Sequence, residues 1–248
     1  MCRVHVFSIY IFFSMKFAVI VFPGSNCDDD MVHVLGEVMG GDVVKVWHKD
    51  THLPEGFTTE DCVVLPGGFS YGDYVRSGAI AQFSPIMQAV KAFAAEGGYV
   101  WGICNGFQIL CESHLLPGAL MHNANQQFIC KNVWLKTETN ESPITRSLDL
   151  ERPLKIPIAH AEGRYYADEA TLDRLEANGQ VLFRYCDEAG NVTEAANPNG
   201  AARAIAGICN ERRNVFGMMP HPERAAETDL ANTDGRALFE SLMGLVGA

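Results

Sequence analysis

The stretch Gly-Ile-Cys-Asn occurs twice, at residues 102–105 and 207–210, and each copy offers a cysteine that could act as a nucleophile. Cys104 stands between an apolar run and a helical pattern, with a glycine two residues before it and another two residues after it. This pattern has the form of a nucleophile elbow, a sharp strand-to-helix turn that holds a side chain above a sheet edge. The N–H groups of the following helical turn favour a thiolate there, and the N–H of Asn105 is placed to hold an oxyanion.

Cys209 lacks this setting, because the polar stretch 210–214 after it is typical of a hairpin turn rather than of a helix. We therefore expect Cys209 to be a structural thiol at a strand end. The elbow pattern around Cys104 is short, so its assignment as a nucleophile depends on a base and an orienting acid elsewhere in the chain.

His221 is the best candidate for that base, because proline stands on both sides of it and Glu223 follows two residues later. Flanking prolines keep a segment extended, and in an extended segment positions i and i+2 point to the same face. The Glu223 carboxylate would then fix the tautomer of the imidazole and stabilise the imidazolium. A rigid loop with a capping histidine is the alternative. No metal site is expected, since His48 and His52, although four residues apart, lie in an expected loop.

A glycine-rich segment at residues 65–79 follows another expected strand. It lacks the Gly-Lys-Ser/Thr of a nucleotide-binding loop. In a parallel sheet this segment lies at the same carboxyl edge as Cys104, so its N–H groups could supply a second oxyanion donor. A plain structural loop is the alternative.

Composition favours one folded domain. The chain has 248 residues, of which 48% are hydrophobic and 20% charged, enough for a sizeable core without long disordered tracts. A net charge of −11 without a basic run argues against nucleic-acid binding. The eight cysteines include no Cys-x-x-Cys pair, which favours a reducing compartment and hence a cytoplasmic protein.

The first residues, 1–14, are apolar, but Lys16 interrupts the run before it could span a membrane. Because residues from Met15 onward form a complete strand and turn, we interpret residues 1–14 as an extension from an early start and residues 15–248 as the domain. A genuine anchor or targeting piece is the alternative.

Strand and helix patterns alternate through the first half of the chain, which predicts an α/β fold with an open, mostly parallel sheet and helices on both faces. The second half is less regular. The expected strands are 16–22, 43–47, 62–65, 99–103, 128–137, 154–159, 181–185, 204–208 and 215–218, and the expected helices are 28–39, 85–95, 107–116, 169–177 and 233–246.

These segments together resemble the class I (triad) glutamine amidotransferases, and most closely the glutaminase subunits that serve purine biosynthesis. The similarity runs from about Met15 to the C-terminus. The motifs that carry it are Phe22–Asp28, Pro66–Ala79, Gly102–Gln108, Ala159–Gly163, Asn197–Gly200 and Gly217–Arg224. The resemblance implies Cys104 as nucleophile, His221 as base and Glu223 as third member of a triad. It further implies oxyanion donors at Gly68 and Asn105, and bound glutamine near Gly67, Gly68, Phe69 and Gln108.

The resemblance also implies an activity: hydrolysis of L-glutamine to glutamate and ammonia. The ammonia would pass to a separate synthetase subunit, which uses ATP and Mg²⁺ to convert formylglycinamide ribonucleotide to formylglycinamidine ribonucleotide. A small third subunit is expected in that complex, and no cofactor in this chain. We expect the glutaminase to stay idle until it docks, because the Gly67–Gly68 peptide could flip easily.

Three other functions compete with this one. An amidotransferase serving a different acceptor is disfavoured by the Gly-Gly-Phe-Ser-Tyr-Gly-Asp loop at residues 67–73. A cysteine hydrolase or stress protein with a similar elbow would not call for the Pro-His-Pro-Glu segment. A binding subunit with a dead site ranks low, since all three triad residues are present.

Overall fold

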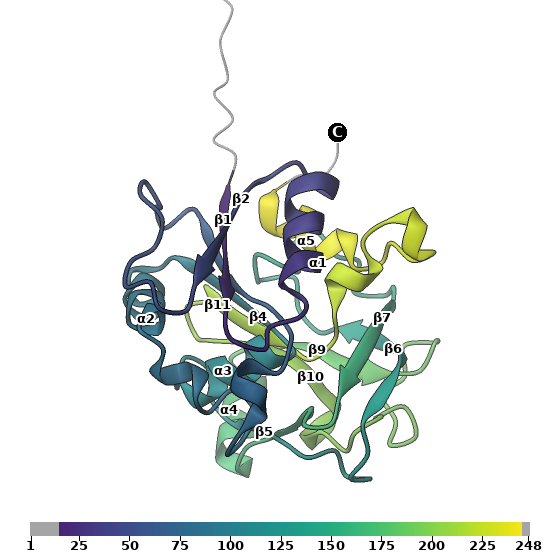
Figure 1. Cartoon of the computed structure of the whole chain (residues 1–248). Helices are drawn as coiled ribbons and strands as arrows, with labels where there is room; N and C mark the ends of the chain where they lie inside the picture. The colour runs from purple at the N-terminus through teal and green to yellow at the C-terminus, as the bar shows by residue number, and fades with distance from the viewer. Residues whose placement is uncertain (1–14, 245–248) are drawn as a thin grey trace, which may run out of the picture.

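The computed structural model describes residues 15–244, so the expected extension, residues 1–14, and residues 245–248 lie outside the described part. A nine-stranded sheet with the order β2-β1-β3-β4-β11-β10-β9-β6-β7 forms the centre of the molecule (Figure 1). Its strands are β1 Lys16–Val21, β2 Asp42–Trp47, β3 Cys62–Leu65, β4 Tyr99–Ile103, β6 Ile129–Thr137, β7 Leu154–His160, β9 Val181–Cys186, β10 Ile205–Cys209 and β11 Val215–Met218.

The predicted open α/β sheet is confirmed. Strands β2, β1, β3, β4 and β11 pair in parallel, as expected for a half in which strands and helices alternate. Strands β10, β9, β6 and β7 continue the sheet by antiparallel pairing. Because two successive antiparallel pairings restore the original direction, β9 and β7 run the same way as the parallel strands, and only β10 and β6 run against them.

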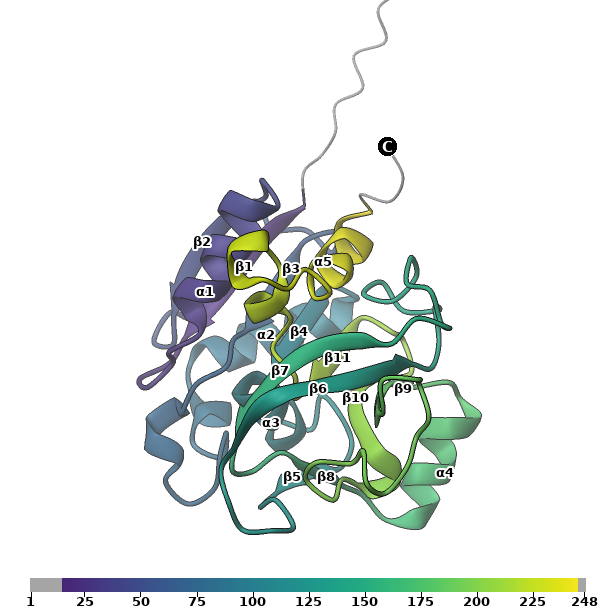
Figure 2. The same ribbon diagram turned by 90° about the vertical axis from the view of Figure 1, so that its right-hand side faces the viewer.

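Helices cover both faces of the parallel half, which explains its apolar strands. The helices are α1 Asp28–His33, continued by the π-helix Val34–Val38, α2 Ile86–Glu96, α3 Asn105–Glu112, α4 Glu169–Ala177 and α5 Arg236–Met243. Helices α1 and α5 lie on one side of β1, β4 and β11, with α2 and α3 on the other (Figures 1 and 2). Every residue of β3 is buried, as the strand covered on both faces requires.

Two short strands were not expected from the sequence. Strands β5 (Ala119–Met121) and β8 (Arg164–Tyr166) pair with each other in a separate two-stranded sheet. Each has three residues, too few for the alternation of apolar and polar residues to be recognised. The expected strands and helices all form, with ends that differ by a few residues; the last expected helix is described as far as Met243.

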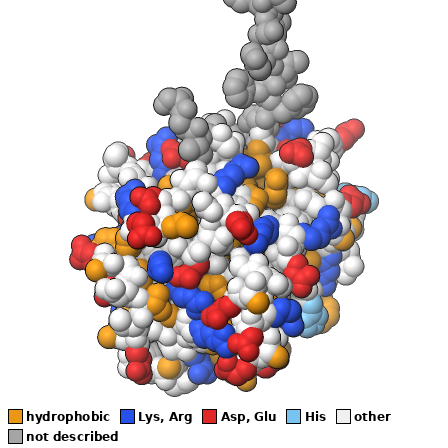
Figure 3. All heavy atoms as spheres, turned by 180° about the vertical axis from the view of Figure 1, so that it is seen from behind, with side chains coloured by type: hydrophobic (Ala, Val, Ile, Leu, Met, Phe, Trp, Pro, Cys, Tyr) orange, Lys and Arg blue, Asp and Glu red, His pale blue; other side chains and the backbone are white. Residues whose placement is uncertain are grey.

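In the described part of the chain, residues 15–244, charged side chains of both signs share the face that Figure 3 shows. Lysine and arginine side chains are interspersed with aspartate and glutamate on the face seen in Figure 3. No helix in this part of the chain combines the length and the apolar character that crossing a membrane requires.

Candidate active site

Cys104 occupies a strained turn between β4 and α3. Its backbone angles are φ 51° and ψ −105°, a conformation that a residue with a Cβ rarely adopts. The turn is tightly packed: a Cβ on Gly106 would lie 1.8 Å from the carbonyl oxygen of Leu65, and one on Gly102 would lie 2.7 Å from the Gly106 backbone. The two glycines therefore permit the elbow that the sequence predicts.

Strand pairing brings the proposed nucleophile and base to the same edge of the sheet. Strands β4 and β11 are parallel neighbours, with Ile103 opposite Met218. The N–H of Cys104 donates to the carbonyl of Met218 at 2.8 Å. This hydrogen bond holds the end of β4 against the end of β11, so the segments that follow the two strands start close together. His221 follows three residues beyond Met218, and its own N–H donates to the carbonyl of Pro157 in β7 at 2.8 Å.

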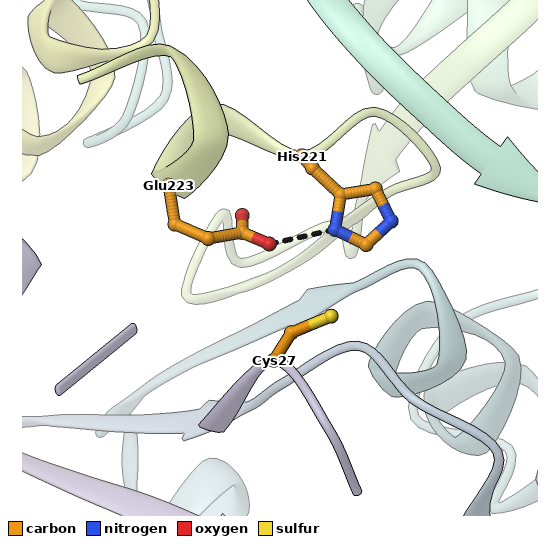
Figure 4. Close-up of side chains that lie close together, drawn as sticks. All are labelled: Cys27, His221 and Glu223. Carbon is orange, nitrogen blue, oxygen red and sulfur yellow. Dashed lines mark hydrogen bonds and ion pairs between the residues drawn. The ribbon is translucent and has the colours of Figure 1, made fainter. Parts of the chain in front are cut away.

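His221 and Glu223 form the buried pair that the sequence predicts, but the expected extended segment is wrong, because a 3-10 helix, Pro222–Ala225, begins directly after His221. The Nδ1 of His221 lies 2.6 Å from Oε1 of Glu223, and the two residues are 2% and 1% exposed (Figure 4). The carboxylate accepts a hydrogen bond from Nδ1, which leaves Nε2 as the working nitrogen. Nε2 is buried and has no hydrogen-bond partner among the described residues.

Electrostatics favour the charged form of this imidazole. Burial by itself lowers the pKa of His221, but Glu223 and Cys104 act against it, and the pKa lies well above its ordinary value. A histidine that gains a proton readily beside a cysteine is suited to accept the thiol proton.

The Gly67–Gly68 peptide is anchored on one side by the segment that follows β1. The carbonyl of Gly67 accepts from the N–H groups of Asn26 at 3.5 Å and Cys27 at 3.2 Å. No described peptide is cis, so the N–H of Gly68 points to the opposite side. A Cβ on Gly68 would lie 2.7 Å from Cα of Ser25, so only glycine fits this approach.

Asn105 and Gln108 tie that loop to helix α3. The Oδ1 of Asn105 accepts from the N–H of Ser70 at 3.1 Å, and its Nδ2 donates to Oε1 of Gln108 at 2.8 Å. The Nε2 of Gln108 donates in turn to the carbonyl of Glu162 at 2.6 Å. Both side chains are buried and bonded at each end, so they hold the walls of the site in place.

A small hollow opens beside Cys104. Of the residues named from the sequence, Gly68, Phe69, Cys104 and Gln108 line it, whereas its lining does not include Gly67, Asn105, His221 or Glu223. The other lining residues are Asp73, Ser77, Ala159, His160, Ala161 and Glu162, and the sequence reasoning assigned none of them a role. All of them fall within the motifs at residues 66–79 and 159–163. The family resemblance therefore pointed to these two segments, although no spacing of residue types identified the individual side chains.

His160 is a buried neighbour of the base. Its Nδ1 lies 3.1 Å from Oδ1 of Asn123, an oxygen that also accepts from the N–H of Gly163. Nδ1 therefore carries the proton, and Nε2 is left as a buried acceptor without a partner among the described residues. Burial and the nearby His221 lower the pKa of His160 to about 4, so this imidazole is neutral at pH 7.

Cys27 lies against the base and was not expected there. Its Sγ, one nitrogen of His221 and one carboxylate oxygen of Glu223 lie within 4.8 Å of one another (Figure 4). These are metal-ligand types, but the His221–Glu223 bond already occupies two of them. Cys27 Sγ also accepts from Arg224 at 3.1 Å, so it has a structural partner of its own.

Cys209 lies in a different environment from Cys104. It ends β10, is fully buried and is followed by the expected hairpin into β11. Burial raises the pKa of Cys209 to about 11, although Arg213 acts in the opposite direction. A thiol of this kind is inert as a nucleophile at neutral pH.

Comparisons with known proteins agree with the predicted resemblance. Residues 14–238 match the family model for the CobB/CobQ-like glutamine amidotransferase domain. The chain is 58% identical over 229 residues to the phosphoribosylformylglycinamidine synthase subunit PurQ of Moorella thermoacetica, covering 92% of this chain and 95% of that protein. It is 56% identical to the subunit of the same name from Rhodopseudomonas palustris, covering 92% of this chain and 97% of the relative.

Solved structures give the same result. A chain in the structure of PurLQS from Thermotoga maritima superposes with a TM-score of 0.79 at 38% identity, covering 94% of this chain and 100% of that one. A putative GMP synthase subunit from Thermoplasma acidophilum superposes with a TM-score of 0.59 at 15% identity, which shows a shared fold only.

Proposed function

The chain belongs to the PurQ family of phosphoribosylformylglycinamidine synthase glutaminase subunits, within the glutamine amidotransferases, and we propose that Cys104, His221 and Glu223 are the residues with which it releases ammonia from L-glutamine. The observation that carries this assignment is the buried hydrogen bond of 2.6 Å between His221 and Glu223, at the sheet edge where the pairing of β4 with β11 also places the strained elbow of Cys104. Cys209, inert in its strand, does not compete for the role.

The reaction follows from these groups. Nε2 of His221 accepts the proton of the Cys104 thiol while Glu223 stabilises the imidazolium. The thiolate attacks the side-chain amide carbon of glutamine, and ammonia leaves with the proton from His221. His221 then takes a proton from water, which cleaves the thioester, releases glutamate and restores the thiol.

The negative charge on the amide oxygen needs donors on the other side of the substrate. We assign this role to the N–H of Gly68, which points away from the Asn26–Cys27 anchor, and to the N–H of Asn105 at the start of α3. Gln108 and Phe69 are proposed to border bound glutamine, because both line the hollow beside Cys104.

We propose that the ammonia passes to a synthetase subunit of a complex like PurLQS, which uses ATP and Mg²⁺ to make formylglycinamidine ribonucleotide, and that a small third subunit completes the complex. The reaction would take place in the cytoplasm. Four exposed apolar side chains lie in or near the same loop: Phe69, which lines the hollow, and Tyr74, Val75 and Phe83, which follow it along the chain. We assign the docking of the synthetase to this surface, because Phe69 borders the hollow in which the ammonia would form.

The test is glutamate release from L-glutamine by the wild type and by Cys104→Ser, each alone and with the synthetase subunit, formylglycinamide ribonucleotide and ATP. The proposal expects release that rises with the partner and is lost in the variant. Release that survives Cys104→Ser would overturn the triad. Glutamate release that the partner leaves unchanged would support the proposed hydrolysis of glutamine but overturn the proposed complex with the synthetase.

A further inference from the structure

The side chains of His221 and Glu223 are hydrogen-bonded to each other and to no other described residue. Nε2 of His221 and Oε2 of Glu223 are both buried, and neither has a hydrogen-bond partner in the described part of the chain. The pair lies at the start of the short 3-10 helix Pro222–Ala225, an element whose hydrogen-bond geometry is poorer than that of an α-helix. The orientation of the imidazole therefore depends on the side chains packed around the pair.

The next residue, Arg224, ties this turn to the start of helix α1. Its Nε donates to Oδ2 of Asp30 at 3.2 Å, and its Nη2 donates to Sγ of Cys27 at 3.1 Å. A second contact joins the same two segments, since Nε2 of His33 lies 3.0 Å from Oε1 of Glu227. Because the donors of a guanidinium are fixed relative to one another, two bonds set the direction of the Arg224 side chain.

Cys27 is itself held in place by its neighbours. Its carbonyl accepts from the N–H of Met31 at 3.0 Å, which begins helix α1, and the residue is buried. Its Sγ donates to Oδ1 of Asn26 at 3.1 Å and accepts from Arg224. With one hydrogen bond donated and one accepted, the thiol has a fixed direction.

The sulfur of Cys27 limits the position of the imidazole. Sγ lies within 4.8 Å of a nitrogen of His221 and of a carboxylate oxygen of Glu223 (Figure 4). A Cβ on Gly67 would lie 3.0 Å from this Sγ and 2.7 Å from Cε1 of His221, so the sulfur and the ring close on the same side of Gly67. Packing this dense leaves the ring little room to turn away from its working position.

Cys27 also contacts the segment that carries a proposed oxyanion donor. Its N–H donates to the carbonyl of Gly67 at 3.2 Å, and the N–H of Gly68 points to the opposite side. One residue therefore touches the base through its side chain and the oxyanion peptide through its backbone. Base and donor must both be in place when the amide is attacked, so a shift of Cys27 would disturb two parts of the reaction at once.

We propose that Cys27, held by Arg224, is a positioning residue that keeps the imidazole of His221 aligned with the Gly67–Gly68 peptide. This inference rests on the proposed glutaminase function and adds to it a residue outside the hollow beside Cys104, whose lining does not include Cys27. Loss of the sulfur should therefore impair the chemical step and leave the binding of glutamine largely intact.

A positioning role also predicts a change in the base itself. Burial lowers the pKa of His221, whereas Glu223 and Cys104 raise it. Cys27 acts in the same direction as these two groups. His160, the other titratable neighbour, is neutral at pH 7. Removing the sulfur of Cys27 should therefore lower the pKa of His221, which the loss of a thiol elsewhere in the core would not do.

The first experiment measures glutamine hydrolysis by the full chain with its synthetase subunit. In Cys27→Ala we expect kcat to fall about tenfold or more, with KM changed by no more than about twofold. Cys27→Ser, whose hydroxyl can still accept from Arg224 and donate to Asn26, should recover most of the rate. The control is Cys186→Ala, which removes another buried thiol at the end of β9. A kcat in Cys27→Ala equal to that of the control, or a rise in KM alone, would overturn the proposal.

A double-mutant cycle tests whether Arg224 acts through Cys27. Arg224→Met and Cys27→Ala should each lower kcat, and the double variant should be no slower than the slower of the two single variants. Losses that multiply in the double variant would show two independent roles, and would overturn the proposal that Arg224 holds Cys27 in place for the reaction.

NMR of ¹⁵N-labelled imidazoles in the full chain gives a readout that does not need turnover. The pKa of His221 should fall in Cys27→Ala and keep its wild-type value in Cys186→Ala. An unchanged pKa in Cys27→Ala would contradict the positioning role. If the wild type releases no glutamate from glutamine, the proposed function fails, and this titration still decides whether Cys27 positions the imidazole.

Discussion

The imidazole of His221 and the carboxylate of Glu223 are joined by a hydrogen bond of 2.6 Å inside the protein, although only a proline separates them along the chain. Because Nδ1 is committed to the carboxylate, the base presents the same nitrogen to its substrate at every turnover. The pair therefore behaves as one unit, and a change in either member alters the other.

Replacing Glu223 by glutamine keeps the shape of that unit and removes its charge. We expect kcat for glutamine hydrolysis to fall by a factor on the order of 10³, because an amide neither fixes the tautomer nor stabilises the imidazolium. The pKa of His221 should fall as well, which NMR of a ¹⁵N-labelled imidazole would measure. A loss of less than tenfold would mean that Glu223 serves the fold rather than the reaction.

The strained backbone at Cys104 should lower the free energy of unfolding of the protein. Its φ of 51° and ψ of −105° suit glycine, so Cys104→Gly is expected to be inactive but more stable than Cys104→Ala by about 1–3 kcal/mol. Urea unfolding of the two variants gives the comparison, since both lack the thiol. Equal stabilities would show that the elbow carries no strain.

Gly67 leaves room for the base. A Cβ at this position would lie 2.7 Å from Cε1 of His221 and 3.0 Å from Sγ of Cys27. We expect Gly67→Ala to reduce kcat by a factor on the order of 10², through displacement of the imidazole or of the adjoining oxyanion donor. Gly36→Ala is the control, because the nearest atom to its Cβ would be 3.9 Å away. Similar activities of the two variants would contradict the expectation.

His160 should make the protein sensitive to acid. Its pKa is about 4 in the folded chain and about 6.5 in an unfolded one, so the unfolded state binds a proton first as the pH falls. The contribution of the neutral His160 to the free energy of unfolding is fully present above about pH 6.5. It is lost as the pH falls toward 4, by up to about 1.4 kcal/mol per pH unit. His160→Asn retains a donor for Asn123 and should show a shallower decline between these pH values in urea unfolding. Parallel curves for the two proteins would rule out His160 as the cause.

The proposed docking surface can be tested without touching the reacting groups. Val75 is 94% exposed, so Val75→Lys should leave the fold intact and weaken binding of the synthetase by about tenfold, because it places a charge in an apolar contact. Val192→Lys, at a residue 41% exposed outside the hollow, is the matched control. Calorimetric titration with the synthetase subunit measures both. Unchanged binding in Val75→Lys would show that the synthetase docks on another part of the surface.

The elements and the His221–Glu223 pair could be predicted because their causes are local. Apolar runs ended by glycine or proline predicted the strands. The pairing of His221 with Glu223 was predicted from an extended segment, but it forms across the start of the 3-10 helix Pro222–Ala225. Cys27 against His221, and Asp73 opposite Glu162, could not be predicted from spacing. Both pairs join segments far apart in the chain, and the position of Asp73 depends on left-handed turns at Tyr71 and Asp73 that no residue type there demands.

The adjacency of β4 and β11 has a consequence for how this site can vary. Neighbouring strands are separated by about 4.8 Å, a repeat fixed by backbone hydrogen bonding and common to all sheets. The segments that carry the thiol and the imidazole both begin at this fixed strand spacing. The separation of the two groups therefore depends little on which side chains fill the core. Heat and substitution should disturb the loops at residues 66–79 and 159–163 first, so substrate binding and the oxyanion donor at Gly68 would fail before the thiol and the imidazole move apart.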